Sequence, residues 1–480
     1  MYETKLLRLM KKIDGPALRR FGAYLQRPFC KASEREQQLF EYIATCHPTY
    51  DQKKLRREAV LRKLYGEAGQ EALGKMRKDQ TGLTKLLKAF LMQEALDRQP
   101  LRQQELLLDA YEQWGMGEEF LRAADQQLAK AREAGLDAAS MRFMAELHQR
   151  LFFHPDTEKY SAEAPHLYAA IGYLEQYYLL SKCRLLADAL HRKRVYGSGP
   201  DELFVAELLP LARRHAEVPA LGLYVQLLEI LDGQTPDLQF EPLVAALEER
   251  VDQLSEVDKR NISAKLMYLG YHYYEKGQLD YVPAMVRIAK LADAKGFVTY
   301  QNTITPALFV TTINMAAING DFAWSEYFSR KYAPFLLDTH REAAVQLGES
   351  YLLFYQGHFK AALKHASDVS KVHPGNRVQA ETLFLRLYCE LIAAGEDYWD
   401  ELELCADRFD KYVRDKAFFS PHKKAALLTF IQLASGLARY HSTLDRAERR
   451  ALNTRLAERL RQAEAVYSAH WLRQKIQGLK

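Results

Sequence analysis

The stretch LGYHYYEKGQLDYV, residues 269–282, contains five aromatic rings around a glycine and leads directly into an apolar run. Gly270 places a small residue beside a leucine, where a second helix can approach the first closely. Gly277 follows at the position where the chain must turn. After the turn, apolar residues fall at the three- and four-residue spacing of one helix face: Val282, Val286 and Ala289. The stretch therefore predicts a hairpin of two closely packed helices.

The same pattern recurs in three later segments, INMAAINGDFAWSEYFSRKY, GHFKAALKHASDVSKVHPGN and AAGEDYWDELELCADRFDKYV. Each has a turn that contains glycine, followed by a stripe of small or apolar residues at helical spacing. Equivalent second-helix positions are separated by 43, 37 and 40 residues, and they are Val282, Ser325, Ala362 and Leu402. Recurrence at such a period predicts a stack of helical hairpins.

Read from its Leu-Gly onward, the stretch resembles the tetratricopeptide repeat, W-x2-L-G-x2-Y-x3-G-x-Y-x2-A-x3-F-x2-A. The matching residues are Leu269, Gly270, Tyr273, Gly277, Leu279, Val282, Val286 and Ala289. The resemblance is good over about residues 262–413, weak over 101–261 and absent from 1–100, and the repeats here exceed the family's roughly 34 residues. LRRFGAYLQRPF and YLEQYYLLSKCRLLADALHRK are also similar to uncharacterised bacterial helical-repeat proteins. The resemblance implies an all-α protein with a right-handed superhelix of hairpins.

Four segments are predicted along the chain. Residues 1–100 are expected to form a basic helical bundle, in which Ser33 and Glu36 make a capping box. Degenerate hairpins are expected over residues 101–261, and tetratricopeptide-like repeats over 262–415. Residues 416–480 are expected to form terminal helices that cap the superhelix. In this last segment Ser442 and Asp445 are expected to cap a long charged helix with one apolar face, which consists of Leu452, Leu456, Leu460, Ala463 and Tyr467.

Composition agrees with a helical globular protein. Hydrophobic residues make up 48% and charged residues 27% of the 480 positions, whereas only 24 Gly and 16 Pro occur. No run of alternating β-branched residues bounded by turn signals is found, so no sheet is expected. The five cysteines are scattered and never spaced as CxxC, which argues against a disulfide framework and a structural zinc. No segment has the apolar length of a signal peptide or a membrane span, so the protein is predicted to be cytoplasmic.

Positive charge is concentrated at the N-terminal end. Residues 1–100 contain 21 Lys and Arg against 12 Asp and Glu, whereas the whole chain carries a net charge of only +5. Two basic segments, QKKLRREAVLRK (52–63) and RAERRALNTRLAERLR (446–461), have the composition of phosphate-contacting helices. Neither segment contains interleaved aromatic residues. A solvent-exposed helix face without any ligand also accounts for both segments. A regulator whose N-terminal bundle contacts nucleic acid or another acidic partner is therefore the alternative hypothesis.

Motifs of catalysis are missing. The sequence has no GxxxxGK[ST] phosphate loop and no GxGxxG, HExxH, GxSxG or kinase HRD motif. One DALH segment, with Asp188 and His191, lacks the Glu-based partner that a di-metal helical bundle requires. We therefore expect no enzyme activity, no metal and no cofactor. An enzyme with an unrecognised helical active site would need a buried cluster of titratable groups in a deep pocket, which no motif indicates.

The resemblance implies a binding groove lined by the first helix of each hairpin, which takes extended peptides or helices. Carried over residue by residue, the groove positions are Tyr271, Tyr274 and Asn314, with Tyr351 and Tyr355 in the next hairpin. Tyrosine suits recognition because it offers a rigid apolar ring and a hydroxyl, although packing within the hairpins explains each tyrosine equally well. Groove positions that hold Lys, Arg and Asn in carboxylate-binding relatives are occupied here by Met267, Tyr271, Val310 and Asn314. The leading hypothesis is a non-catalytic scaffold or regulator of a protein partner.

Overall fold

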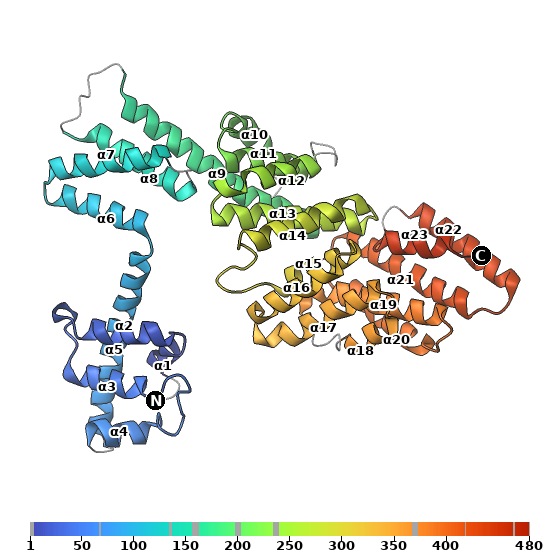
Figure 1. The fold of residues 1–480 in the computed structure, drawn as a ribbon, viewed down its shortest axis with the longest axis horizontal. Coiled ribbons are helices and arrows are strands. Elements are labelled where there is room, and N and C mark those ends of the chain that lie inside the picture. Colours follow the sequence, from blue (N-terminus) through green and yellow to red (C-terminus); the bar gives the residue numbers. More distant parts are fainter. Residues whose placement is uncertain are drawn as a thin grey trace. The chain divides into compact units, whose positions relative to one another are not determined.

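The computed structural model describes residues 4–66, 69–133, 137–155, 163–196, 203–233, 240–366, 373–417, 419–463 and 466–479. These residues form 23 α-helices and several short 3₁₀ turns, and no β-strand occurs in this part of the chain. The predicted all-α class is confirmed. None of the described helices is both long and apolar enough to span a bilayer. The chain divides into two compact units, Met1–Lys130 and Ala131–Lys480, whose helices are labelled in Figure 1.

The first unit is organised around one long helix, α5. Helices α1 to α4 each pack against α5, and α6 contacts its end. The buried face of α5 contributes Met76, Leu83, Leu87 and Phe90 to an apolar core. The helices are α1 (Lys5–Met10), α2 (Gly15–Leu25), α3 (Glu34–Ala44), α4 (Arg57–Tyr65), α5 (Gln70–Asp97), α6 (Pro100–Gln113) and most of α7 (Gly117–Glu133).

The capping box predicted from the sequence is present at the start of α3. The Glu36 carboxylate accepts a hydrogen bond from the Ser33 backbone N–H at 2.8 Å, and the Glu36 N–H donates to the Ser33 hydroxyl at 3.3 Å. Gly82 of α5 lies directly against this cap, since a Cβ at Gly82 would lie 1.6 Å from Glu36 Oε1. A side chain at Gly82 would therefore push Glu36 out of the cap.

Two glycines in α5 give a matched test of this contact. Gly74→Ala is expected to stabilise the protein by about 0.5–1 kcal/mol, because glycine is a poor helix former and nothing lies within 4 Å of the added methyl group. Gly82→Ala should not raise the free energy of unfolding. The gain in helix propensity is the same, but loss of the Ser33–Glu36 cap offsets it by about 1 kcal/mol. Urea denaturation of both variants measures the difference. In a Glu36→Ala background, Gly82→Ala should regain its stabilising effect, and equal effects of the two glycine substitutions in the wild-type background would contradict the assignment.

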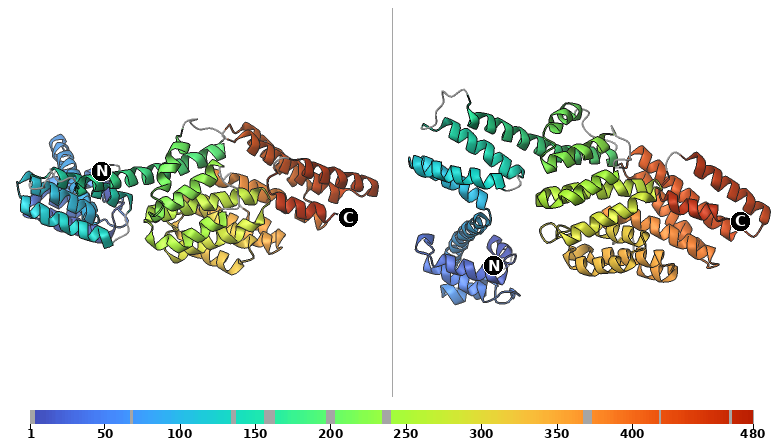
Figure 2. Two further views of the ribbon diagram at one scale, coloured as in Figure 1. Left: turned by 90° about the horizontal axis from the view of Figure 1, so that it is seen from above. Right: turned by 45° about the horizontal axis from the view of Figure 1, so that its top comes forward.

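The second unit is a succession of antiparallel helices. Each helix from α13 to α22 packs against the next helix in the chain. Several pairs of helices two positions apart also contact, among them α11–α13, α12–α14, α15–α17, α17–α19 and α19–α21. Figure 2 shows these helices lying side by side. The helices are α8 (Ala138–Phe153), α9 (Pro165–Tyr196), α10 (Val205–Arg213), α11 (Pro219–Asp232), α12 (Phe240–Arg250), α13 (Glu256–Glu275), α14 (Val282–Ala294), α15 (Pro306–Ile318), α16 (Phe322–Tyr332), α17 (Asp338–Tyr355), α18 (Phe359–His365), α19 (Arg377–Ala393), α20 (Trp399–Asp415), α21 (Pro421–Ser442), α22 (Arg446–Gln462) and α23 (Ala469–Gln477).

The hairpin predicted over residues 269–282 and beyond is formed by α13 and α14. A Cβ at Gly270 would lie 2.5 Å from Met285 Cγ, so only glycine allows α14 to come this close. Gly277 has φ of +87°, a left-handed conformation that favours glycine in the turn. The predicted apolar stripe of α14 is buried: Val282, Val286 and Ala289. The equivalent residues of the later hairpins are also buried: Ser325, Ala362 and Leu402.

The C-terminal end differs from the prediction of one long helix that reaches Tyr467. Asp445 does cap α22, and its carboxylate accepts from the Glu448 N–H at 2.7 Å. Ser442 does not cap it, because Ser442 is the last residue of α21 and its hydroxyl donates to the Ala438 carbonyl. However, α22 ends at Gln462, and α23 begins only at Ala469 after a left-handed residue, Ser468. The change of direction has an energetic reason, because it buries an apolar face on neighbouring helices instead of leaving it in water: Ala469, Trp471, Leu472 and Ile476.

Candidate functional site

The C-terminal segment returns to the hairpin where the repeats begin. Helix α23 contacts both α21 and α13, and the hydroxyls of Tyr467 and Tyr271 lie 2.9 Å apart although 196 residues separate them. The turn at Gly277 touches the same segment, because a Cβ there would lie 3.1 Å from Ala469 Cβ. An ion pair between Lys423 of α21 and Glu275 of α13 lies nearby. The terminal helices therefore contact an inner part of the array as well as its last helices.

Four of the five predicted groove residues are brought together beneath this segment. The Tyr274 and Tyr355 hydroxyls are 3.2 Å apart, which joins α13 to α17. Tyr351 donates a hydrogen bond to the backbone carbonyl of Gln379 at 2.8 Å, and the Gln379 side-chain amide lies 3.4 Å from the Tyr271 hydroxyl. We call the following set the tyrosine–arginine cluster: Tyr271, Tyr274, Tyr351, Tyr355, Tyr467, Arg386 and Trp471.

Arg386 of α19 provides the positive charge of the cluster. Its side chain is buried, and its guanidinium carbon lies 4.2 Å from the ring centre of Phe354, 5.4 Å from that of Tyr355 and 5.5 Å from that of Trp471. One guanidinium nitrogen donates to the Tyr355 hydroxyl at 3.2 Å, whereas Nε has no hydrogen-bond partner among the residues described. This cation therefore lies against aromatic rings and bonds a phenol, and it forms no ion pair with a described carboxylate.

Glu390 lies one turn further along α19 and binds α23 directly. Its carboxylate accepts a hydrogen bond from the Trp471 indole N–H at 2.8 Å and one from the Lys475 ammonium at 2.6 Å. Trp471 and Lys475 are four residues apart, so they lie on the same face of α23. Glu390 is itself largely buried. A single carboxylate therefore recognises an aromatic residue and a lysine on one helix.

The hydroxyls of the cluster hold their protons strongly. Burial raises the pKa of Tyr271, Tyr274, Tyr351 and Tyr467 above the ordinary tyrosine value, so these groups are neutral near pH 7. Burial likewise raises the pKa of the nearby Cys389 thiol, which lowers its reactivity. The arrangement offers ring faces, hydroxyl hydrogen bonds, one cation and one carboxylate.

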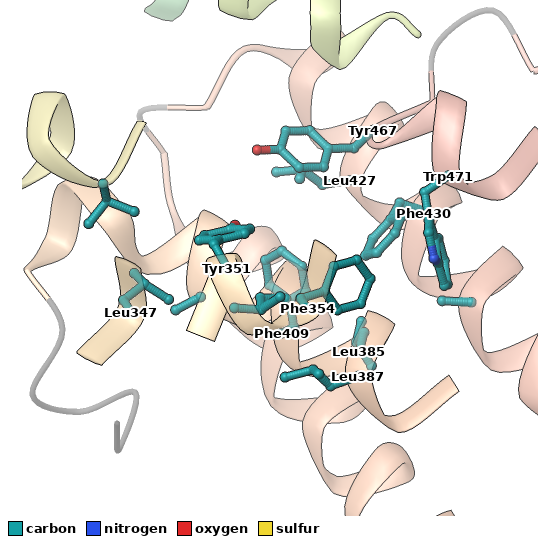
Figure 3. Close-up of a cluster of buried hydrophobic side chains, with 14 of the residues drawn as sticks. Leu347, Tyr351, Phe354, Leu385, Leu387, Phe409, Leu427, Phe430, Tyr467 and Trp471 are labelled. Carbon is teal, nitrogen blue, oxygen red and sulfur yellow. The ribbon is translucent and has the colours of Figure 1, made fainter. Parts of the chain in front are cut away.

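The tyrosines predicted to line a groove are largely covered in the structure. Tyr351 and Tyr274 are only 2% and 8% exposed, and Tyr271 and Tyr355 are half-buried. The physical reason is that the C-terminal segment covers this face. In Figure 3 Tyr467 and Trp471 lie beside Phe430 of α21, in the same buried cluster as Tyr351 and Phe354. Whether these residues bind a partner stays a prediction.

Asn314, the fifth predicted residue, does not join the cluster. It is 2% exposed within α15, and its side-chain oxygen has no hydrogen-bond partner among the residues described. Its position next to the buried Ile313 and Met315 makes it part of the packed core of this helix. Asn314 therefore lacks the accessibility expected of a groove residue.

Sequence reasoning missed the two charged residues of α19 and the tryptophan of α23. Arg386 and Glu390 stand four residues apart within the otherwise apolar run LFLRLYCELIAA. Charged residues are almost never fully buried unless they are paired, so their place in such a run is a signal that could have been used. Trp471 is one of only four tryptophans in the chain, and it lies beyond the segment assigned to the last helix.

The other segments singled out from the sequence have ordinary surroundings. Asp188 of the DALH segment forms an ion pair with Lys265, and burial lowers the pKa of His191 to about 4. No group of three potential metal ligands is found within the described ranges. The basic segment 52–63, which runs into α4, has six exposed cations: Lys53, Lys54, Arg56, Arg57, Arg62 and Lys63. None of these cations forms an ion pair with another described residue. Contact with nucleic acid by this segment stays a prediction.

Comparison with protein-family models, with curated proteins and with solved structures finds no match to this chain. The likeness to tetratricopeptide repeats therefore rests on the residues of the hairpins and on their all-helical structure.

Proposed function

We propose that the second unit is a non-catalytic interaction module that binds a helix of a protein partner on the face formed by α13, α17 and α19. In this proposal the hairpins form a tetratricopeptide-like superhelix, and α23 is an internal ligand of its groove. The observation that carries the proposal is the engagement of Trp471 and Lys475 by the single carboxylate of Glu390. A helix seated in a groove by a few anchor side chains is a common mode of recognition.

The properties of α23 favour an exchangeable ligand. The helix has only nine residues, and isolated helices of that length are marginal in water. Its helical form therefore depends on the contacts that hold it in place. Those contacts include the two hydrogen bonds that Trp471 and Lys475 donate to the carboxylate of Glu390, and each hydrogen bond to a charged group contributes only about 1.5–3 kcal/mol. A partner helix that supplies the same groups can replace them.

The same contacts specify the chemistry of the partner. An aromatic residue is required beside Arg386, where the cation faces the ring. A lysine four residues later is required at Glu390. Such a partner helix would present Trp or Tyr and Lys on one face, as Trp471 and Lys475 do here.

A peptide-binding experiment tests the proposal. A tethered helix acts at an effective concentration in the millimolar range, so a labelled peptide of residues 463–480 should bind wild-type protein weakly. In the full-length Trp471→Ala variant the internal ligand is weakened, and we expect the peptide to bind at least about tenfold more tightly, as measured by fluorescence anisotropy. Adding Glu390→Gln should weaken binding again by about tenfold, because a hydrogen bond to a charged group is lost.

A peptide in which the position of Trp471 holds alanine is the matched control and should not bind. The proposal fails if the Trp471→Ala protein keeps its helical circular dichroism and yet binds neither peptide. It also fails if both peptides bind equally well.

A further inference from the structure

A separate cavity lies between α13, α14 and α15, beneath the loop that joins the last two of these helices. Its volume is about 170 Å³, and its walls are mainly apolar. The principal wall residues are Met267, Ile288, Ala289, Ala292, Phe297 and Leu308. None of them belongs to the tyrosine–arginine cluster, so the cavity is independent of the proposed helix-binding face.

The size of the cavity exceeds ordinary packing defects. Protein interiors are close-packed, with few voids larger than a water molecule, and an engineered apolar cavity of about 150 Å³ is large enough to hold benzene. The loop over the cavity has a defined shape, because Tyr300 and Thr303 form an antiparallel bridge around two left-handed residues, Gln301 and Asn302. Tyr300 and Thr303 both line the cavity and are exposed, which places its mouth at this turn.

One buried hydroxyl in the wall has no partner. Ser263 of α13 is 6% exposed, and its Oγ forms no hydrogen bond with any described residue. Leaving a buried hydroxyl unpaired is unfavourable by about 1–3 kcal/mol. If no molecule bound in the cavity, alanine at position 263 would avoid this free-energy penalty. The Ser263 hydroxyl is therefore a donor in the cavity wall that no described residue uses.

Of the described residues that line the cavity, only Arg260 is charged, and it is a cation. The Arg260 guanidinium carbon lies 5.1 Å from the centre of the Tyr300 ring, at the mouth. Its ion pair with Glu256 is long, at 3.5 Å, and Glu256 is more than half exposed, so it competes weakly for the guanidinium. Arg260 and Ser263 are three residues apart on α13 and lie on one helix face. Together they can donate hydrogen bonds to one carboxylate at the mouth of the cavity.

We propose that this cavity binds a small organic acid whose apolar body is about the size of a benzene ring. The carboxylate lies at Arg260 and Ser263, and the body occupies the apolar interior between Ile288, Ala292 and Phe297. An anionic head group is favoured because none of the described residues that line the cavity is acidic. Such a ligand would connect α13, α14 and α15 and thus stabilise the folded second unit.

Titration of the full-length protein with phenylacetate tests the proposal, with ligand-observed NMR and calorimetry as readouts. We expect a dissociation constant of about 1 mM or lower, which is modest for a ligand of this size. Arg260→Gln should weaken phenylacetate binding by about tenfold or more and leave the binding of neutral benzyl alcohol nearly unchanged. Ser263→Ala should weaken phenylacetate binding by severalfold.

Two further variants decide between the cavity and a surface site. Ala289→Met fills the cavity and should abolish the binding of both compounds. Arg287→Gln removes a cation of α14 that does not line the cavity, and it should leave both affinities unchanged. The proposal is wrong if phenylacetate does not bind the wild-type protein, if Ala289→Met binds it normally while folded by circular dichroism, or if Arg260→Gln weakens both compounds equally.

Discussion

Replacement of Asp258 by asparagine is expected to destabilise the second unit by about 3–5 kcal/mol, the usual effect of removing one charge from a buried ion pair. Asp258 is 1% exposed and accepts two hydrogen bonds from the guanidinium of Arg184, at 2.7 and 2.6 Å. It also accepts from the Tyr224 hydroxyl at 3.1 Å and from the Ser255 hydroxyl at 2.6 Å. This one carboxylate therefore ties α9 and α11 to the start of α13. Urea denaturation followed by circular dichroism measures the loss.

A neighbouring aspartate provides the control for this prediction. The Asp252 carboxylate is 70% exposed and pairs with Lys295 at the surface, where water and salt screen the interaction. Asp252→Asn should therefore leave the urea midpoint unchanged. An equal fall in both variants would show that burial of Asp258 is not the source of its effect.

Replacement of Trp471 by alanine is expected to destabilise the protein by about 3–5 kcal/mol, as is usual when a large buried aromatic residue is truncated. The indole is 5% exposed, lies against Phe430 and Arg386, and donates to Glu390. Its removal leaves a cavity beside a buried cation and a buried carboxylate, and both charged groups lose a partner. Urea denaturation gives the total effect, and amide hydrogen exchange shows where it falls.

Trp114 is the matched control, because its side chain is 74% exposed. Trp114→Ala should change stability by no more than about 0.5 kcal/mol. If Trp471→Ala changes stability as little as Trp114→Ala does, the Trp471 indole is not buried against Phe430, Arg386 and Glu390. If α23 is an exchangeable ligand, its amides should exchange faster in Trp471→Ala than those of α19, because local opening then precedes global unfolding. Uniform acceleration throughout the second unit would instead assign α23 to the permanent core.

The local features of the fold could be predicted because the residues that cause them are close in sequence. The cap at Ser33 and Glu36 and the cap at Asp445 each involve residues three positions apart. The close helix approach at Gly270 and the left-handed turn at Gly277 follow from the absence of a side chain. Helical periodicity likewise identified the buried stripes of the hairpins, since it fixes which residues share a face.

The accessibility of the predicted groove could not be obtained in this way. The sequence placed Tyr271, Tyr274, Tyr351 and Tyr355 on related helix positions, and the structure brings their side chains together. No pattern in the sequence indicated that Tyr467 and Trp471 would cover these four tyrosines. Periodicity describes one helix at a time, whereas a contact across 196 residues depends on the rotation of every helix pair between the two segments. Those rotations are set by side-chain packing at each interface. The relative position of two distant segments depends on all of these rotations together, so only the folded structure determines it.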